Sequence, residues 1–271
     1  MIRWLERRLP GLAATVRSAR ARRAREAQPL VETPWGFKFA GATPDLSDPV
    51  ERAHVHSIET LIDEADVFVD VGANIGFFSC LARSHGRSVV AVEPFPVNVE
   101  SVVRNCEANG WRDVDIHRAA LADREGTGVL YGRDTLASRV EGWAIADDPW
   151  RQNVVLTTLD AVIGARFERQ SVAIKVDVEG GEFDLLRGAS ATLDRTPAPV
   201  WSVEISLTEN HPGGRNPHFI DTFELFFSRG YTARTIGDEG VRDVSPEDVT
   251  AWAAAGRRGF GSMNYLFSRT G

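Results

Sequence analysis

From residue 67 onward, short apolar runs alternate with helical stretches, and this rhythm limits the chain to few architectures. The first apolar runs are Val67–Val71 and Ser88–Glu93, followed by helical patterns at 76–84 and 96–109. Short continuous apolar runs are typical of strands buried in a parallel sheet. Strands that alternate with helices form βαβ units. The sequence therefore predicts an α/β fold with a doubly wound, mainly parallel sheet.

The alternation continues through the second half of the chain. Further strands are expected at Val114–His117, Ala173–Val178, Val200–Ile205, Tyr231–Ile236 and Asn264–Phe267, and further helices at 49–64, 181–192 and 217–229. The late pair of strands indicates an antiparallel edge. We expect residues 31–271 to form one domain, since a single α/β domain of this length is common.

Residues 124–157 interrupt the alternation. This insertion is rich in glycine and contains Trp143 and Trp150. We expect it to form a lid or an additional hairpin. Its indole rings have two interpretations of equal weight, which are stacking on a sugar or aromatic acceptor and packing of the insertion onto the core.

The net charge of −7 is distributed unevenly. Residues 1–28 hold eight arginines and two acidic residues, which give +6, so the rest of the chain carries −13. An acidic body of this kind is not typical of a nucleic-acid-binding domain. We therefore expect no nucleic-acid partner.

Residues 1–30 form a basic arm with helical spacing of apolar residues. Leu5, Leu9, Leu12 and Val16 recur at that spacing among the arginines. A basic amphipathic helix binds weakly to an anionic membrane surface or a partner, or it is a solvated or packing helix whose arginine stems lie over apolar surface. The second interpretation is favoured. An organellar transit peptide, which is also rich in arginine and poor in acids, is a further alternative. The arm lacks the continuous apolar run of a secretory signal.

The cysteine content and hydropathy indicate a cytoplasmic protein. Cys80 and Cys106 are the two cysteines, and alone they form neither a disulfide framework nor a structural zinc site. Both fall in predicted helices, where free buried thiols are typical, as in a reducing compartment. No stretch of 18 apolar residues predicts a transmembrane helix.

The turn between the first strand and the first helix lies at the expected ligand site. It reads DVGANIG over residues 70–76. Ligands of open α/β sheets bind beyond the carboxyl ends of the strands. Glu93 ends the second strand, 21 residues after Gly72. An acid at that position accepts hydrogen bonds from ribose hydroxyls.

The spacing of the glycines separates two cofactor classes. A dinucleotide fold needs G-x-G-x-x-G, whose middle glycine lets the backbone approach a pyrophosphate. Here Asn74 stands at the middle position, and no third glycine follows Gly76 in register. Asp70 repels phosphates and favours an ammonium or a sulfonium. The turn therefore predicts S-adenosylmethionine and not NAD, the alternative being that Gly72 and Gly76 only shape a tight turn.

Four blocks in order carry a family resemblance. They are VFVDVGANIGFFSCLA, VVAVEPFPVNVESVVRNCEANG, TLDAVI and IKVDVEGGEFDLLRGA. Together they resemble the FkbM family of S-adenosylmethionine-dependent methyltransferases over roughly residues 67–210. The resemblance implies a class I, Rossmann-like methyltransferase fold with a seven-stranded sheet whose last strand is antiparallel. It also implies O-methylation, often of sugar or polyketide hydroxyls.

The resemblance implies a set of cofactor-binding residues. Around the methionine part it places Asp70, Gly72, Asn74 and Gly76, with Ala73 and Phe77 beside them; it places Glu93 on the ribose, Pro94 and Phe95 near the adenine, and Ala120 and Leu121 at the adenine edge. The chain reads Gly180-Gly181-Glu182 where many members have Gly-His-Glu. This departure leaves the substrate open.

A second group of acids follows the strand predicted at 173–178. Alternation places Lys175, Asp177 and Glu179 on one side if the strand stays extended. We expect Asp177 to be the general base for a hydroxyl, with help from Glu179. In the alternatives, these acids pair with lysine or arginine, or Asp177 and Glu204 hold a divalent metal such as Mg²⁺.

His211 lies in a loop just past the strand predicted at 200–205. It is a further candidate base, the alternative being a surface histidine. The whole pattern predicts an O-methyltransferase that acts on a hydroxyl of a small molecule or a sugar. The alternatives are methylation of RNA or protein, and a cofactor-binding scaffold without catalysis.

Overall fold

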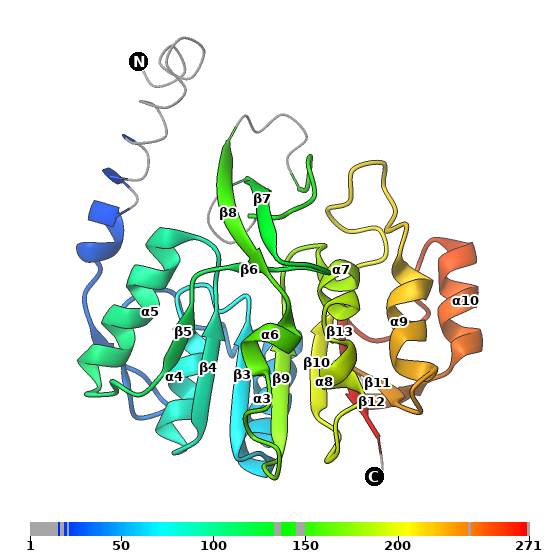
Figure 1. The fold of residues 1–271 in the computed structure, drawn as a ribbon, viewed down its shortest axis with the longest axis horizontal. Helices are drawn as coiled ribbons and strands as arrows, with labels where there is room; N and C mark the ends of the chain where they lie inside the picture. The colour runs from blue at the N-terminus through cyan, green and yellow to red at the C-terminus, as the bar shows by residue number, and fades with distance from the viewer. Residues whose placement is uncertain are drawn as a thin grey trace.

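The apolar runs of the sequence form the parallel centre of the main sheet (Figure 1). Its parallel strands, in spatial order, are β5 (Asp115–His117), β4 (Ser88–Val92), β3 (Val67–Val71), β9 (Val172–Val176) and β10 (Val200–Glu204). Every residue of β3 and β9 is buried, because both faces of the sheet are covered. This computed structural model describes residues 16, 19–20, 22–132, 137–144, 150–237 and 240–269.

The sheet continues beyond β10 with antiparallel pairs. β13 (Asn264–Ser268) lies between β10 and β11 (Thr232–Gly237), and β12 (Gly240–Val244) follows β11 at the edge. The predicted doubly wound sheet with an antiparallel edge is confirmed. The described residues place eight strands in this sheet, and β12 is the strand that the predicted seven did not include.

Helices cover both faces of the sheet. They are α3 (Pro49–Glu64), α4 (Phe77–Ser84), α5 (Pro96–Ala108), α6 (Leu159–Ile163), α7 (Glu182–Arg187), α8 (Ser190–Leu193), α9 (Phe219–Phe227) and α10 (Pro246–Ala255). The sides of β3 show the two layers. Val67, Val69 and Val71 pack with α6 to α9, while Phe68 packs with α3, α4 and α5. Asp70 alternates with these valines and therefore faces the α3–α4 layer.

The helix predicted at 181–192 is divided into α7 and α8. The carboxylate of Asp160 accepts hydrogen bonds from the backbone N–H groups of Ala191 and Thr192, at 2.9 and 2.8 Å. These donors belong to the first turn of α8 and lack partners within the helix. A side chain from α6 therefore caps a separate helix start.

The insertion forms a hairpin rather than a strand of the main sheet. β7 (Gly126–Tyr131) pairs antiparallel with β8 (Arg151–Thr157), and β6 (Ala120–Leu121) pairs parallel with β8. The hairpin rises above one end of the main sheet (Figure 1). Of the two forms expected for this insertion, the additional hairpin is the observed one.

The amino-terminal segment runs along α5. Residues 22–26 are helical, and Arg22 pairs with Glu100 of α5. Arg104 donates hydrogen bonds to the carbonyl oxygens of Arg25 and Gln28, at 2.7 and 2.8 Å. These contacts support packing for the described end of the arm. Leu5, Leu9 and Leu12 lie outside the described residues.

The structure also shows where the two cysteines lie and whether a described helix could cross a membrane. Cys80 and Cys106 are free thiols, both buried between α4 and α5. In the described part of the chain, no helix has the length and apolarity needed to cross a membrane.

Candidate active site

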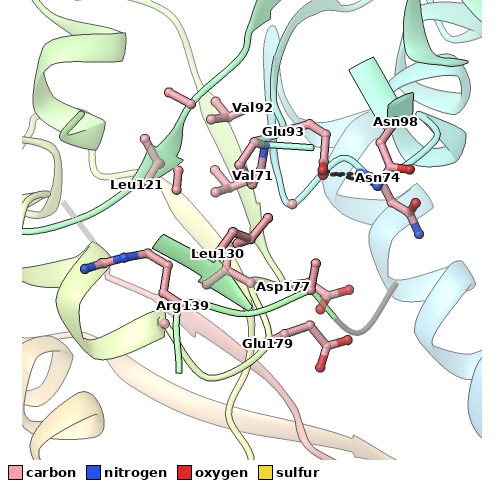
Figure 2. A pocket seen from close by; sticks show the side chains of 17 residues that line it. Val71, Asn74, Val92, Glu93, Asn98, Leu121, Leu130, Arg139, Asp177 and Glu179 are labelled. Carbon is pink, nitrogen blue, oxygen red and sulfur yellow. Dashed lines mark hydrogen bonds between the residues drawn. The ribbon is translucent and has the colours of Figure 1, made fainter. Parts of the chain in front are cut away.

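A cavity opens at the carboxyl ends of β3, β4 and β9, where the insertion hairpin covers the sheet (Figure 2). Its volume is about 790 Å³, including the part open to solvent. Eight residues of the predicted site line it, namely Gly72, Asn74, Glu93, Pro94, Ala120, Leu121, Asp177 and Glu179.

The other predicted residues lie outside this lining. They are Asp70, Ala73, Gly76, Phe77, Phe95, Glu204 and His211. Phe77 packs between the rings of Phe37 and Phe39, and Phe95 packs against Trp150 at 5.3 Å between ring centres. The structure thus places Phe77 and Phe95 in aromatic clusters outside the cavity lining.

Glu93 ties together the loops that follow β3 and β4. Its carboxylate accepts a hydrogen bond from the backbone N–H of Asn74 at 2.9 Å (Figure 2). It also accepts from the backbone N–H of Phe95 at 2.9 Å and from the side chain of Asn98 at 3.2 Å. Burial raises the pKa of Glu93 to about 7, although these three donors act in the opposite direction. Glu93 therefore fixes the glycine turn as well as facing the cavity.

The glycine turn also contacts the loop after β9. Gly72 has a φ of +76°, and a β-carbon there would lie 1.8 Å from the carbonyl oxygen of Asp177. The backbone N–H of Asp177 donates to the carbonyl of Val71 at 3.1 Å. Glycine is required at this position because the two backbones touch.

Three charged side chains, Asp70, Lys175 and Asp177, form a row that leads from the buried strands to the cavity. Asp70 and Lys175 are direct neighbours on β3 and β9. Ser79 donates to Asp70 at 2.6 Å, and the Nζ of Lys175 lies 4.0 Å from Asp70 and 3.2 Å from Asp177. Burial lowers the pKa of Lys175, but the charges of Asp177 and Asp70 outweigh burial and raise it above its usual value. The predicted alternative of pairing with Lys175 is thus observed for Asp177.

The strand ends earlier than predicted, and this changes how Glu179 reaches the cavity. β9 ends at Val176, and Glu179 has a φ of +56°. Alternation along an extended strand was therefore the wrong reason for placing Glu179 beside Asp177. Figure 2 shows that their carboxylates nonetheless point to the same side of the cavity.

Burial raises the pKa of three glutamates around this loop. Burial, reinforced by the charge of Asp177, raises the pKa of Glu179 to about 7. Burial likewise raises the pKa of Glu182 to about 7, and burial with the neighbouring carboxylates raises that of Glu204 to about 9. The cluster therefore holds protons near neutral pH.

The metal alternative finds no support in the side-chain arrangement. Among the residues that the structure describes, no three or more His, Cys, Asp or Glu side chains gather as metal ligands. Asp177 bonds to Lys175 instead, and Glu204 lies where burial favours its neutral form. Neutral carboxyls are poor cation ligands.

Trp143 and His211 meet behind Glu179. The indole Nε1–H of Trp143 donates to Glu179 Oε2 at 2.8 Å, and its ring lies edge-on to His211 at 4.6 Å. His211 is buried, and its Nε2 lies 3.0 Å from the hydroxyl oxygen of Ser206. The packing interpretation therefore describes both tryptophans of the insertion, and His211 is not the surface histidine of the alternative.

Among the cavity residues that the sequence did not indicate, Asn98 and Arg139 have polar side chains. Asn98 lies in the first turn of α5 and bonds to Glu93, and its position five residues after that acid is a signal in the sequence. Arg139 comes from the irregular part of the insertion, where no local pattern marks it. Its guanidinium points away from Asp177 and Glu179 in Figure 2 and lies 3.5 Å from Asp184.

The sequence comparisons give a match to one family. The family profile described as Methyltransferase FkbM domain matches residues 70–233, which is more than half of the chain. No curated protein matches the chain in sequence.

Several solved structures resemble the chain at low sequence identity. An O-methyltransferase from Bacillus cereus in complex with SAH is 12% identical, with 98% of each chain covered and a TM-score of 0.41. Cofactor-bound Rv0187 from MTB is 15% identical, covering 97% of this chain and 93% of that chain, with a TM-score of 0.42. Ribosomal protein L11 methylase from Lactobacillus delbrueckii subsp. bulgaricus is 11% identical, covering 80% and 79%, with a TM-score of 0.42.

Proposed function

Because the chain belongs to the FkbM family of methyltransferases, we propose that it transfers a methyl group from S-adenosylmethionine to a hydroxyl of a small molecule or a sugar. It is an S-adenosylmethionine-dependent methyltransferase with the class I fold that the sequence predicts. The observation that carries the choice of a hydroxyl is the pair of carboxylates, Asp177 and Glu179, in the cavity wall.

The cavity holds an unused hydrogen-bond acceptor where the cofactor is expected. Asn74 Oδ1 is buried and has no hydrogen-bond partner within the described part of the chain. Buried polar atoms are rarely left unpaired, so an N–H group or ammonium of a ligand suits this atom. Asn74 thus fits a role in holding the amino-acid part of S-adenosylmethionine, beside the open backbone of Gly72.

Methylation of a hydroxyl needs a group that accepts the hydroxyl proton. S-adenosylmethionine supplies a methyl group on a positively charged sulfur. A general base is most effective when its pKa lies near the working pH, as the pKa of Glu179 does. Asp177 is bonded to Lys175, so it suits a hydrogen bond that orients the acceptor. We assign proton removal to Glu179 and orientation to Asp177, which reverses the roles expected from the sequence.

The charge around the cavity favours an uncharged, hydroxylated acceptor. Asp177 and Glu179 accept hydrogen bonds from hydroxyl groups, and Glu182 and Glu204 add acidic groups nearby. The phosphate backbone of RNA requires basic contacts, and the chain beyond residue 28 carries −13. These features support a small molecule or a sugar over RNA.

A methyl-labelling panel tests the proposal. The protein is incubated with S-adenosylmethionine carrying a labelled methyl group and with sugars, oligosaccharides, polyketide-like alcohols, RNA and unfolded protein. We expect a mass increase of one methyl group in a hydroxylated small molecule, and its loss in Glu179→Gln. Label found only in RNA or protein would overturn the proposal, and so would cofactor binding without transfer to any member of the panel.

A further inference from the structure

We propose that Trp143 is a positioning residue, whose indole N–H holds the carboxylate of Glu179 toward the cavity. The inference rests on the proposed function, because it gives that carboxylate its catalytic role. The hydrogen bond from Trp143 Nε1 to Glu179 Oε2 is 2.8 Å long, and Trp143 is 5% exposed. A hydrogen bond from a buried donor to a carboxylate is strong and directional.

The backbone at Glu179 makes such a restraint necessary. Glu179 adopts a left-handed conformation, with a φ of +56°, directly after the end of an extended segment. Residues other than glycine pay for this conformation, and it persists only where the surroundings impose it. The hydroxyl of Ser138 donates to the carbonyl oxygen of Glu179 and so holds the backbone there. Trp143 and Ser138 therefore fix the side chain and the backbone of the same residue.

The indole ring of Trp143 lies against Gly180, in the space that a side chain at residue 180 would need. A β-carbon on Gly180 would lie 2.4 Å from Cζ3 of the indole. His211 contacts the ring edge-on, with 4.6 Å between ring centres. With Gly180 against the ring and His211 at its side, the indole is a fixed part of the wall and offers no open face on which an acceptor can stack.

The segment that carries Trp143 is attached to two loops. One is the loop after β9, which carries Glu179, and the other is the loop after β10. Ser138 bonds to the loop after β9, and the backbone N–H of Ala144 donates to the carbonyl of Asn210, after β10, at 2.9 Å. Residues 137–144 thus bridge the two loops, with Trp143 between them. The insertion supplies a restraint that the strands themselves lack.

The contact is tested without any acceptor. In protein labelled with ¹⁵N at its seven tryptophans, Trp143→Phe removes one indole resonance and thereby identifies it. In Glu179→Ala we expect this resonance to move and its N–H hydrogen to exchange with water faster, by on the order of tenfold or more. The matched control, Asp177→Ala, removes a neighbouring carboxylate and leaves the exchange rate unchanged.

Kinetics then test the positioning role. Trp143→Phe keeps an aromatic ring over Gly180 and removes only the donor. With the hydroxylated acceptor found by the labelling panel, we expect kcat to fall by on the order of tenfold while the KM for S-adenosylmethionine stays the same. Trp252→Phe, which alters a buried tryptophan of α10, leaves both constants unchanged.

The outcomes separate this inference from the proposed function. A Trp143 resonance that is indifferent to Glu179→Ala overturns the inference, whatever the acceptor is. A resonance that responds, together with an unchanged kcat in Trp143→Phe, also overturns it. A resonance that responds in a protein that methylates no member of the panel supports the contact and counts against the proposed function alone.

Discussion

The carbonyl oxygen of Asp177 occupies the space beside Gly72 that a side chain would need, because a β-carbon on Gly72 would lie 1.8 Å from it. The turn after β3 and the acid after β9 are thus in direct backbone contact. In addition, the backbone N–H of Asp177 donates a hydrogen bond to the carbonyl oxygen of Val71, at 3.1 Å. We therefore expect a substitution in the turn after β3 to displace Asp177 as well.

Gly72→Ala should disrupt both stability and cofactor binding. The substitution combines a left-handed backbone with a collision against Asp177, so we expect a loss clearly above the roughly 1–2 kcal/mol that the backbone conformation alone costs. Gly86→Ala is the matched control, since Gly86 has a φ of +77° and nothing within 4 Å of an added β-carbon. Urea unfolding measures the loss of stability in each of the two variants. Equal losses would show that the backbone contact does not matter.

Glu93→Gln should weaken the binding of S-adenosylmethionine. The backbone N–H of Asn74 then loses a charged acceptor, and the glycine turn is less firmly held. We expect a loss of about 1–3 kcal/mol in binding free energy, measured by calorimetric titration. Glu107→Gln, on the exposed side of α5, should leave the affinity unchanged. NAD should not bind to any of these proteins, and tight NAD binding would contradict the assignment of the turn.

Glu179→Gln and Asp177→Asn should affect turnover differently. Loss of the base should lower kcat by about 10²-fold or more and remove the acidic limb of the pH profile near pH 7. Asp177→Asn should lower turnover but keep that limb, because the group that takes the proton is still present. Both variants should bind S-adenosylhomocysteine like the unaltered protein. If the limb disappears in Asp177→Asn instead, the two roles are reversed.

Stability should fall as the pH rises from about 6.5 toward 9. Burial raises the pKa values of Glu93 and Glu182 from 4.5 to about 7, and that of Glu204 to about 9. Burial lowers the pKa values of His54 and His211, which act in the opposite direction only below about pH 6.5. Above that pH the folded chain binds more protons than the unfolded chain, and the free energy of unfolding decreases with pH. The shift of the pKa of Glu93 from 4.5 to about 7 corresponds to about 3 kcal/mol of free energy of unfolding.

Urea unfolding at several pH values checks this dependence. Glu204→Gln should flatten the decrease between about pH 7 and 9, because an amide does not titrate. Glu224→Gln, which changes an exposed carboxyl of α9, should leave the curve as it is. A free energy of unfolding that rises with pH over this range would refute the expected direction.

The strands were predicted well because their signal is local. Val67–Val71 is apolar throughout except for Asp70, and its bounds agree with those of β3. The glycine turn was found for the same reason, since residue type and spacing determine such a turn. α10 had a local signal too, a capping box between Ser245 and Asp248, and it was overlooked.

The parts that were not predicted depend on contacts between distant segments. Glu179 reaches the cavity through a left-handed backbone held by Ser138 and Trp143, which lie about forty residues earlier. The direction of Asp70 follows from simple alternation, but its partner Lys175 belongs to a strand on the far side of the insertion. Spacing along the chain does not encode such pairs, so the contacts of these acids could not be predicted from the sequence.

The position of β13 determines when the sheet can be completed. This strand, at residues 264–268, lies between β10 and β11, so two strands that precede it in the chain are held apart until it arrives. Without β13, β10 and β11 each have an unpaired edge, and such edges promote wrong pairing. A chain that ends before residue 264 therefore leaves the sheet divided between β10 and β11, and the last strand of the sequence joins the two parts.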